Sequence, residues 1–422
     1  MLRRLLTSLS PDVRPFRDSR DYRLLTLGAL ITGLGTQASL VALPYQVYVT
    51  THEPVLVGLL GLVELGPLVA ASLFGGALAD RYDRRRLLLI YQLLLVAVAG
   101  ALAAVSFLGT PGIGILYVLA GALAGAGQLE RVARAAIVPN VVRREYMRPA
   151  ISNMFGLMQL TMVVGPGVGG LLIAAFDVQA AYTVDAASCL GMALAAAAMS
   201  PQPPHGAHHD PVLRSIADGL RFVKGQQALI GSFAIDLLAM TFGMPRALFA
   251  VMSVTLYHAG AAGTGALYAA VSAGATIAAL TTGWLSHARY LGRIVIGAVT
   301  VWGAAIAAAG LMPSLALAAL LLAIAGAADS VSAVCRSTIS QSLTPDHMRG
   351  RMSSVFSLVV AGGPRLGDVE SGTVASLTST RVSVTSGGIA CLAGVALIVV
   401  AFPEFAGYDG DAVEAAAAAA AA

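Results

Sequence analysis

Long apolar runs recur along the whole chain and are separated by short polar connections. Each run is close to the roughly 20 residues that a helix needs to cross a bilayer. The pattern therefore predicts an all-α membrane protein with about twelve transmembrane helices. The expected spans are 24–49, 55–79, 87–108, 113–137, 151–174, 180–200, 228–250, 262–285, 293–312, 314–337, 353–376 and 383–403.

The longest polar connection, 201–227, divides these spans into two sets of six. It opens with PQPPHGAHH and continues with Leu213, Ile216, Leu220 and Val223 at helical spacing beside basic residues. This spacing predicts an amphipathic helix on the cytoplasmic membrane surface. We expect a cytoplasmic arm (1–23), a first six-helix half (24–200), this linker, a second six-helix half (228–403) and a disordered cytoplasmic tail (404–422).

Basic residues are distributed unevenly among the connections. They lie in the N-terminal arm and in every even-numbered connection, whereas the odd-numbered connections lack lysine and arginine until Arg381 in the last one. Because cytoplasmic loops are enriched in these residues, both termini are expected to be cytoplasmic. The chain is then a multi-pass protein of the inner (plasma) membrane.

Composition limits the class of protein further. The chain is 57% hydrophobic and 11% charged, whereas soluble proteins carry about 25% charged residues. The net charge of +4 then reflects inside-facing arginines, and no nucleic-acid partner is expected. No nucleotide-binding G-x-x-x-x-G-K-[ST] motif occurs in the sequence. We expect no cofactor and no metal site, and we interpret His205, His208 and His209 as parts of a solvated linker.

The connection after the second span reads GGALADRYDRRRLLL, from Gly75 to Leu89. It resembles the G-x-L-A-D-R-x-G-R-R motif of the major facilitator superfamily, with Asp83 in place of the second glycine. The resemblance implies the superfamily fold of two pseudo-symmetric halves and a cytoplasmic gate that an aspartate latches against a helix of the other half. A plain positive-inside anchor is the alternative. The residues of the expected gate are Gly76, Asp80, Arg81, Arg84 and Arg85.

Span five contains GPGVGG, which resembles the antiporter motif of proton-coupled exporters in this superfamily. The matching residues are Gly165, Pro166, Gly169 and Gly170. Proline and glycines favour a bendable helix that packs closely against its neighbours; ordinary small-residue packing is the alternative. The segments RAAIVPNVV, DLLAMTFGMPRALF and TPDHMRGRMSSV are similar to the enterobactin-exporter-like branch. The arginine that many drug exporters carry early in span four is missing from 117–127.

Ionisable residues inside spans are costly and are therefore functional candidates. Glu64 and Asp236 are expected near the midplane, one in each half, where a carboxylate could take up and release a proton. Each could instead be the structural partner of a buried arginine. Asp329 and Arg336 share one face of span ten and predict a second charged network near the cytoplasmic gate.

Spans four and eleven carry further charges. Glu130 and Arg131 are adjacent and cannot share one helix face, so we expect each to pair with another span. Arg365 and Asp368 are one turn apart and are expected to neutralise each other, which leaves Glu370 as a candidate for lining a cavity.

These observations predict a secondary active transporter and not an enzyme. The favoured function is a proton-coupled exporter of a small amphipathic molecule, such as a drug or siderophore, that works by alternating access. Its expected partners are this substrate, protons and the lipid bilayer, and we expect a monomer. An importer or facilitator of the same fold, or a non-transporting membrane sensor or assembly factor, are the alternatives.

Overall fold

The computed structural model describes residues 12–204, 212–345 and 348–410, and every regular element in these ranges is helical. The helices of the first part are α2 (Arg14–Asp18), α3 (Arg20–Thr51), α4 (Pro54–Arg81), α5 (Arg84–Phe107), α6 (Ile113–Val141), η1 (Arg144–Tyr146) and α7 (Met147–Ala198). The later helices are α8 (Val212–Val223), α9 (Gln227–Phe242), α10 (Leu248–Thr255), α11 (Gly260–Thr281), η2 (Thr282–His287), α12 (Leu291–Leu311), α13 (Leu315–Leu343), α14 (Arg349–Leu377), α15 (Thr380–Ala401) and α16 (Pro403–Ala406).

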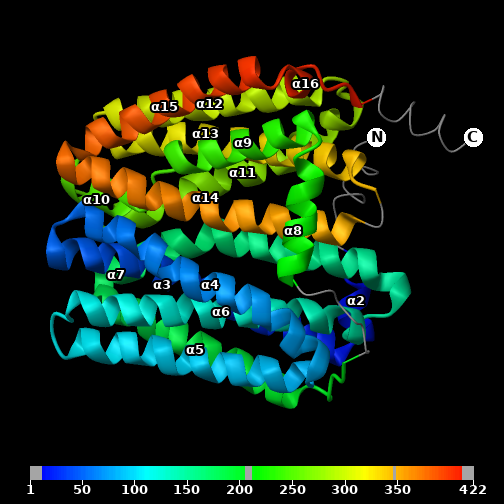
Figure 1. The fold of residues 1–422 in the computed structure, drawn as a ribbon. Coiled ribbons are helices and arrows are strands. Elements are labelled where there is room, and N and C mark those ends of the chain that lie inside the picture. The colour runs from blue at the N-terminus through cyan, green and yellow to red at the C-terminus, as the bar shows by residue number, and fades with distance from the viewer. Residues whose placement is uncertain (1–11, 205–211, 346–347, 411–422) are drawn as a thin grey trace, which may run out of the picture.

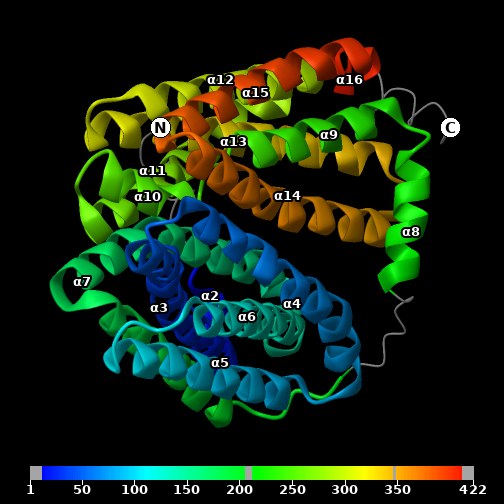
Figure 2. The same ribbon diagram turned by 60° about the vertical axis from the view of Figure 1, so that its left-hand side comes forward.

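The long helices run roughly side by side in two groups (Figure 1). Helices α3 to α7 form the lower group in this view and α9 to α15 form the upper group, while α8 crosses one end of the bundle. The two groups pack together mainly through α4 against α14 and through α7 against α11. Helices α2 and α16 lie at the same end of the bundle as α8 (Figures 1 and 2).

Within the described residues, nine helices are long and apolar enough to cross a membrane. They are α3, α4, α5, α6, α7 with η1, α11 with η2, α12, α13 and α15. Helix α14 is not among these nine helices, and it carries Arg365, Asp368 and Glu370 among its apolar residues.

Helix α7 is a run of 52 residues that is interrupted at Asp177, where φ is 66° and ψ is 176°. Its two segments pack along α3 in opposite directions, since the α3 partners ascend along the first segment and descend along the second. The pairs are Thr161 with Gly33, Gly169 with Ala38, Ser188 with Gly35 and Met192 with Gly28. The interruption lies where the sequence predicts a connection between two spans.

The expected continuous span 228–250 is wrong, because the structure divides it between α9 and α10. Helix α9 ends at Phe242, and α10 begins at Leu248. Pro245 lies in the intervening segment, and a proline provides no N–H for a helical hydrogen bond. The interruption exposes backbone groups that other side chains must satisfy.

Helix α8 occupies the predicted amphipathic segment but packs partly on protein. Gly219 lies against the backbone of Arg351 on α14, and Asp218 forms an ion pair with Arg351 at 3.4 Å. Val223 is buried, whereas Leu220 is 48% exposed. The end of α14 therefore covers one face of α8. His205, His208 and His209 lie outside the described residues.

The expectation that the tail 404–422 is disordered is wrong for its first residues. Helix α16 lies there, Phe405 is buried, and Asp409 pairs with Arg289 at 2.7 Å. Residues 411–422 lie outside the described residues.

Candidate functional site

One charged cluster joins the two helix groups beside the interrupted helix. Glu64 on α4 and Arg365 on α14 form an ion pair at 3.6 Å, and their side chains are 28% and 17% exposed. Arg246, between α9 and α10, acts electrostatically on Glu64 and on the buried carboxylate of Asp368. Arg365 thus pairs with a carboxylate on another helix, and it also interacts electrostatically with Asp368, one turn further along α14.

Side chains from three neighbouring helices satisfy the backbone of the interruption. The Trp302 Nε1–H donates to the carbonyl oxygen of Gly243 at 2.8 Å, and the Tyr268 hydroxyl donates to that of Arg246 at 3.0 Å. The Ala247 N–H donates to Asp368 Oδ1 at 3.1 Å. Non-helical backbone at membrane depth is tolerated only where such partners exist. These hydrogen bonds therefore stabilise the interruption between α9 and α10 inside the protein.

A second cluster lies within the later helices. Arg336 on α13 forms an ion pair with Asp236 on α9 at 2.8 Å and lies 3.7 Å from Asp329. Its guanidinium also donates to the Ser332 hydroxyl at 3.1 Å. Asp236 and Arg336 are buried, whereas the Asp329 side chain is 32% exposed. The structure thus gathers into one network three residues that the sequence placed in two separate sites.

A third cluster lies on α6, and it corrects the expectation that its charges pair with other spans. Glu130 is buried and forms an ion pair with Arg134, one turn further along the same helix, at 3.2 Å. Arg131 is exposed and donates to the side-chain oxygen of Gln128 at 2.6 Å. Residues three or four positions apart share a helix face, so each charge finds a partner within α6 itself.

Glu370 is half-buried on α14. In the part of the chain that the structure describes, no hydrogen bond or ion pair is assigned to its side chain. The structure brings it into none of the three clusters above.

The arginines of the basic connection between α4 and α5 form hydrogen bonds near the ends of three helices. Arg84 donates to the carbonyl oxygens of Ala79 and Ala136 at 3.2 Å and 2.9 Å. Arg85 donates to the carbonyl oxygens of Ala196 and Ala197 near the end of α7. Both arginines therefore bind backbone carbonyl oxygens near the ends of α4, α6 and α7, where a positive charge is favourable.

Asp83, the departure from the motif, has a structural role that the sequence reading missed. Its carboxylate caps α5 by accepting from the Arg86 N–H at 3.0 Å, and it accepts from the Gln202 N–H at 2.9 Å. An aspartate just before a helix is a common N-cap, so the signal was present in the sequence. Asp80 and Arg81 end α4, and the space around Gly76 is open.

The GPGVGG segment of α7 packs against helices on two sides. Gly165 and Gly169 lie against Gln37 and Ala38 of α3. Gly170 lies against the backbone of Gly265 and Ala261 on α11, where a side chain would clash with that helix. The segment therefore holds α7 in close contact with α3 on one side and with the second helix group on the other.

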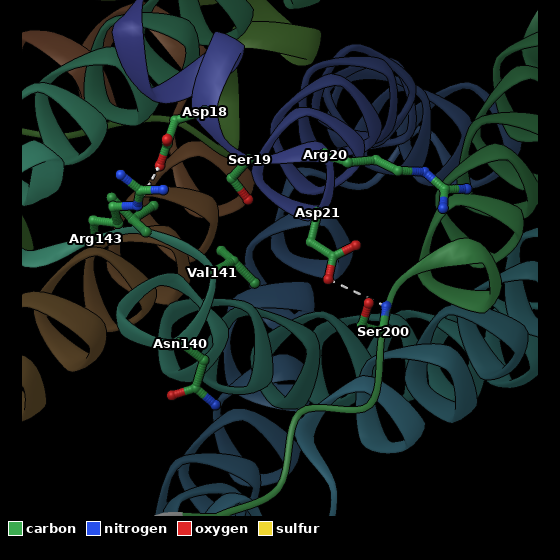
Figure 3. A pocket seen from close by; sticks show the side chains of 9 residues that line it. Asp18, Ser19, Arg20, Asp21, Asn140, Val141, Arg143 and Ser200 are labelled. Carbon is green, nitrogen blue, oxygen red and sulfur yellow. Dashed lines mark hydrogen bonds and ion pairs between the residues drawn. The ribbon is translucent and has the colours of Figure 1, made fainter.

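Two cavities lie at or near the end of the bundle that contains α8. The larger one, about 460 Å³, is an open surface hollow that includes Asp18, Asp21, Arg143 and Ser200 (Figure 3). Asp18 pairs with Arg143 at 3.3 Å, and Asp21 accepts from the Ser200 N–H at 3.2 Å. These contacts tie the end of α2 and the start of α3 to the segments that follow α6 and α7. The smaller cavity, about 90 Å³, lies between α3, α6 and α7 and includes Arg134 and Met158.

Comparisons with known proteins agree with this architecture. The profile of the family described as "Transmembrane secretion effector" matches residues 10–419. Enterobactin exporters EntS of Shigella boydii serotype 4 and Escherichia coli O81 are each 29% identical over 393 residues, which cover 90% of this chain and 91% of the relative.

Solved structures of transporters share the fold. The nucleoside transporter NupG (D323A mutant) superposes with a TM-score of 0.71 at 14% identity, over 92% of this chain and 99% of that chain. A bacterial homologue of the lysosomal transporter Spinster, in an inward-facing and unoccupied conformation, gives 0.68 at 15% identity, over 91% and 95%.

These findings confirm the predicted resemblance, and they identify a multi-pass secondary transporter that is not an enzyme. The chain belongs to the transmembrane secretion effector family of the major facilitator transporters.

Proposed function

We propose that this protein is a proton-coupled exporter of a small amphipathic molecule. The observation that carries the proposal is the Glu64–Arg365 ion pair, which joins α4 of the first helix group to α14 of the second. A carboxylate that can gain a proton, held in an ion pair between two bodies, couples protonation to their separation.

The proposed architecture has twelve spans in two halves of six. Counting α7 as two segments, and adding the interrupted α9–α10 and the polar α14 to the other apolar helices, gives this number. The charge distribution of the connections supports cytoplasmic termini and an inner (plasma) membrane location. The arrangement supports an alternating-access cycle in which the halves rock about the charged clusters.

In the proposed cycle, substrate loaded from the cytoplasm displaces Glu64 from Arg365, and the outer parts of α4 and α14 separate. In the structure they are held together there by close contact of Gly58 with Gly372 and by a hydrogen bond from the Val55 N–H to Ser376 Oγ at 2.9 Å. After the substrate leaves, Glu64 takes up a proton from outside and the outer side closes. Release of the proton to the cytoplasm then restores the ion pair.

Four further groups of residues take supporting roles in this proposal. Asp236, paired with Arg336, is the proton-coupling candidate of the second half, while Glu130 and Glu370 are candidates for lining the substrate path. Asp80, with Gly76 and the arginines of its connection, latches the cytoplasmic side when the outer side opens. The close packing at Gly165, Pro166, Gly169 and Gly170 supports an outer side that closes tightly, as an exporter needs.

The relatives named as enterobactin exporters support a siderophore-like molecule as the substrate. Such a molecule combines polar groups with an apolar body, which suits a cavity that mixes charged and apolar side chains. We expect a monomer in the bilayer, with this small molecule and protons as its partners.

Proton-driven efflux from proteoliposomes tests the proposal, with fluorescent phenylnaphthylamine as the probe. Glu64→Gln and Asp236→Asn should each abolish the response to an imposed pH gradient, while Asp18→Asn at the surface hollow should retain it. If both variants respond like the wild type, the mechanism is wrong. Uptake instead of efflux in a counterflow assay would indicate an importer, and binding without flux would indicate a sensor.

A further inference from the structure

The smaller cavity combines an apolar wall with a positive charge. It lies between α3, α6 and α7, and its lining residues are Thr26, Ala29, Leu30, Gly33, Arg134, Met154, Leu157, Met158 and Thr161. Methionine side chains are flexible and polarisable, so they adapt to different apolar surfaces. With a volume of about 90 Å³, the cavity accommodates part of a drug-sized molecule, since whole-ligand pockets are roughly 300–1,000 Å³.

The residues that line this cavity lie at a similar distance from the ends of the three helices. Thr26 lies six residues after the start of α3, Met154 lies seven after the start of α7, and Arg134 lies seven before the end of α6. At about 1.5 Å per residue, each is roughly 10 Å from the helix end near the basic connections. The cavity therefore lies within the inner half of the proposed spans, where a cytoplasmic molecule would first enter.

The charges beside the cavity do not balance. Helix α6 presents Arg131 and Arg134 but only one carboxylate, Glu130, and that carboxylate pairs with Arg134. Arg131 lies one turn from Arg134, and its described hydrogen bond is to the neutral amide of Gln128. Arg365 on α14, which is itself paired with Glu64, also acts electrostatically on Arg131.

An unbalanced positive charge in a span is costly unless something neutralises it. Guanidinium groups bind carboxylates and other oxyanions through charge-assisted hydrogen bonds. We infer that Arg134, which lines the cavity, and Arg131, which lies outside its lining one turn away on α6, form with the Met154–Leu157–Met158 wall a substrate subsite for amphipathic organic anions. This inference rests on the proposed transport function and narrows its substrate class to molecules that carry an ionised acidic group on an apolar body.

Binding of two matched probes tests the subsite without any proton gradient. Anilinonaphthalene sulfonate and phenylnaphthylamine share one aromatic body and differ in the sulfonate. Both are titrated against the full-length protein in nanodiscs, with empty nanodiscs as the blank. The wild type should bind the sulfonate at least several-fold more tightly than the neutral probe.

Two variants act on the charge of the subsite independently. Arg131→Gln leaves the Glu130–Arg134 pair intact and should weaken binding of the sulfonate by about tenfold or more, which corresponds to a lost charge-assisted hydrogen bond. Met158→Glu places a carboxylate at a side chain that is 45% exposed and should weaken the same probe. Arg148→Gln, outside the cavity, is the control, and binding of the neutral probe should change less than twofold throughout.

The inference is overturned if the wild type binds both probes equally, or if neither Arg131→Gln nor Met158→Glu weakens binding of the sulfonate selectively. A protein that binds the sulfonate selectively but shows no proton-driven efflux would retain this subsite while refuting the proposed coupling. The converse result, proton-driven efflux without anion preference, would refute the subsite alone.

Discussion

Asp185 shows how a buried carboxylate is held inside the first helix group. It is 1% exposed and accepts hydrogen bonds from the hydroxyls of Ser39 at 2.6 Å and Thr36 at 3.2 Å on α3. These bonds join the second segment of α7 to α3. Its partners are 146 and 149 positions away, so no local sequence pattern predicts them.

Replacing this carboxylate should destabilise the protein. Asp185→Ala leaves the buried hydroxyl of Ser39 without its acceptor and removes the acceptor of Thr36, at an expected cost of about 1–3 kcal/mol. Thermal unfolding of the detergent-solubilised protein measures the effect. Thr183→Ala is the matched control, because the Thr183 hydroxyl bonds only within its own helix, to Gln179, and its removal should leave the unfolding temperature nearly unchanged. Equal unfolding temperatures for the two variants would refute the structural role of Asp185.

Among the helices, the interruption between α9 and α10 was the largest departure from the sequence reading. Hydrophobicity alone made 228–250 one span, and Pro245 was the overlooked signal. Its stabilising partners, Trp302, Tyr268 and Asp368, come from three other helices. Tertiary contacts of this kind determine where a helix is interrupted, and one chain read alone does not reveal them.

Hydrogen exchange should report these contacts directly. Asp368→Ala removes the acceptor of the Ala247 N–H, so exchange in peptides that cover 243–248 should accelerate. Trp302→Phe removes the donor to the Gly243 carbonyl but keeps an aromatic side chain, and it should accelerate exchange in the same peptides. Peptides from α5 serve as the internal control. Unchanged exchange at 243–248 in both variants would show that these side chains do not hold the interruption.

The contact between α7 and α11 depends on glycine. Gly170→Val would place a side chain against the backbone of Ala261 and Gly265, so the two helices would have to separate. We expect lower thermal stability and loss of proton-driven efflux. Gly156→Ala, on the same helix with open space around it, should retain both properties. Wild-type efflux in Gly170→Val would contradict a role for this contact in closing the outer side.

For the whole protein, sequence reading gave the class, the helical architecture and the family. It did so because bilayer thickness and loop charge act on local composition, which one chain contains. The partners of individual charges were less predictable, as Glu130 and Arg365 show. Which helix face a charge occupies follows from periodicity, but which neighbour it meets depends on the packing of distant helices.

Cysteine accessibility tests the proposed twelve-span topology. The natural cysteines Cys189, Cys335 and Cys391 are buried, so background labelling should be low. A membrane-impermeant maleimide added to intact cells should label Thr110→Cys after α5 and should not label Arg144→Cys after α6 until the cells are opened. Labelling of both positions from outside, or of Arg144→Cys alone, would contradict the orientation.

The most direct test of the proposed coupling is proton-driven efflux by Glu64→Gln. The glutamine preserves the shape of the side chain but can neither take up a proton nor form the ion pair with Arg365. We predict that an acidic exterior accelerates probe efflux from wild-type proteoliposomes and has no effect on the variant, although the variant still binds the probe. An undiminished response of Glu64→Gln to the pH gradient would show that protons are not coupled through the contact between α4 and α14.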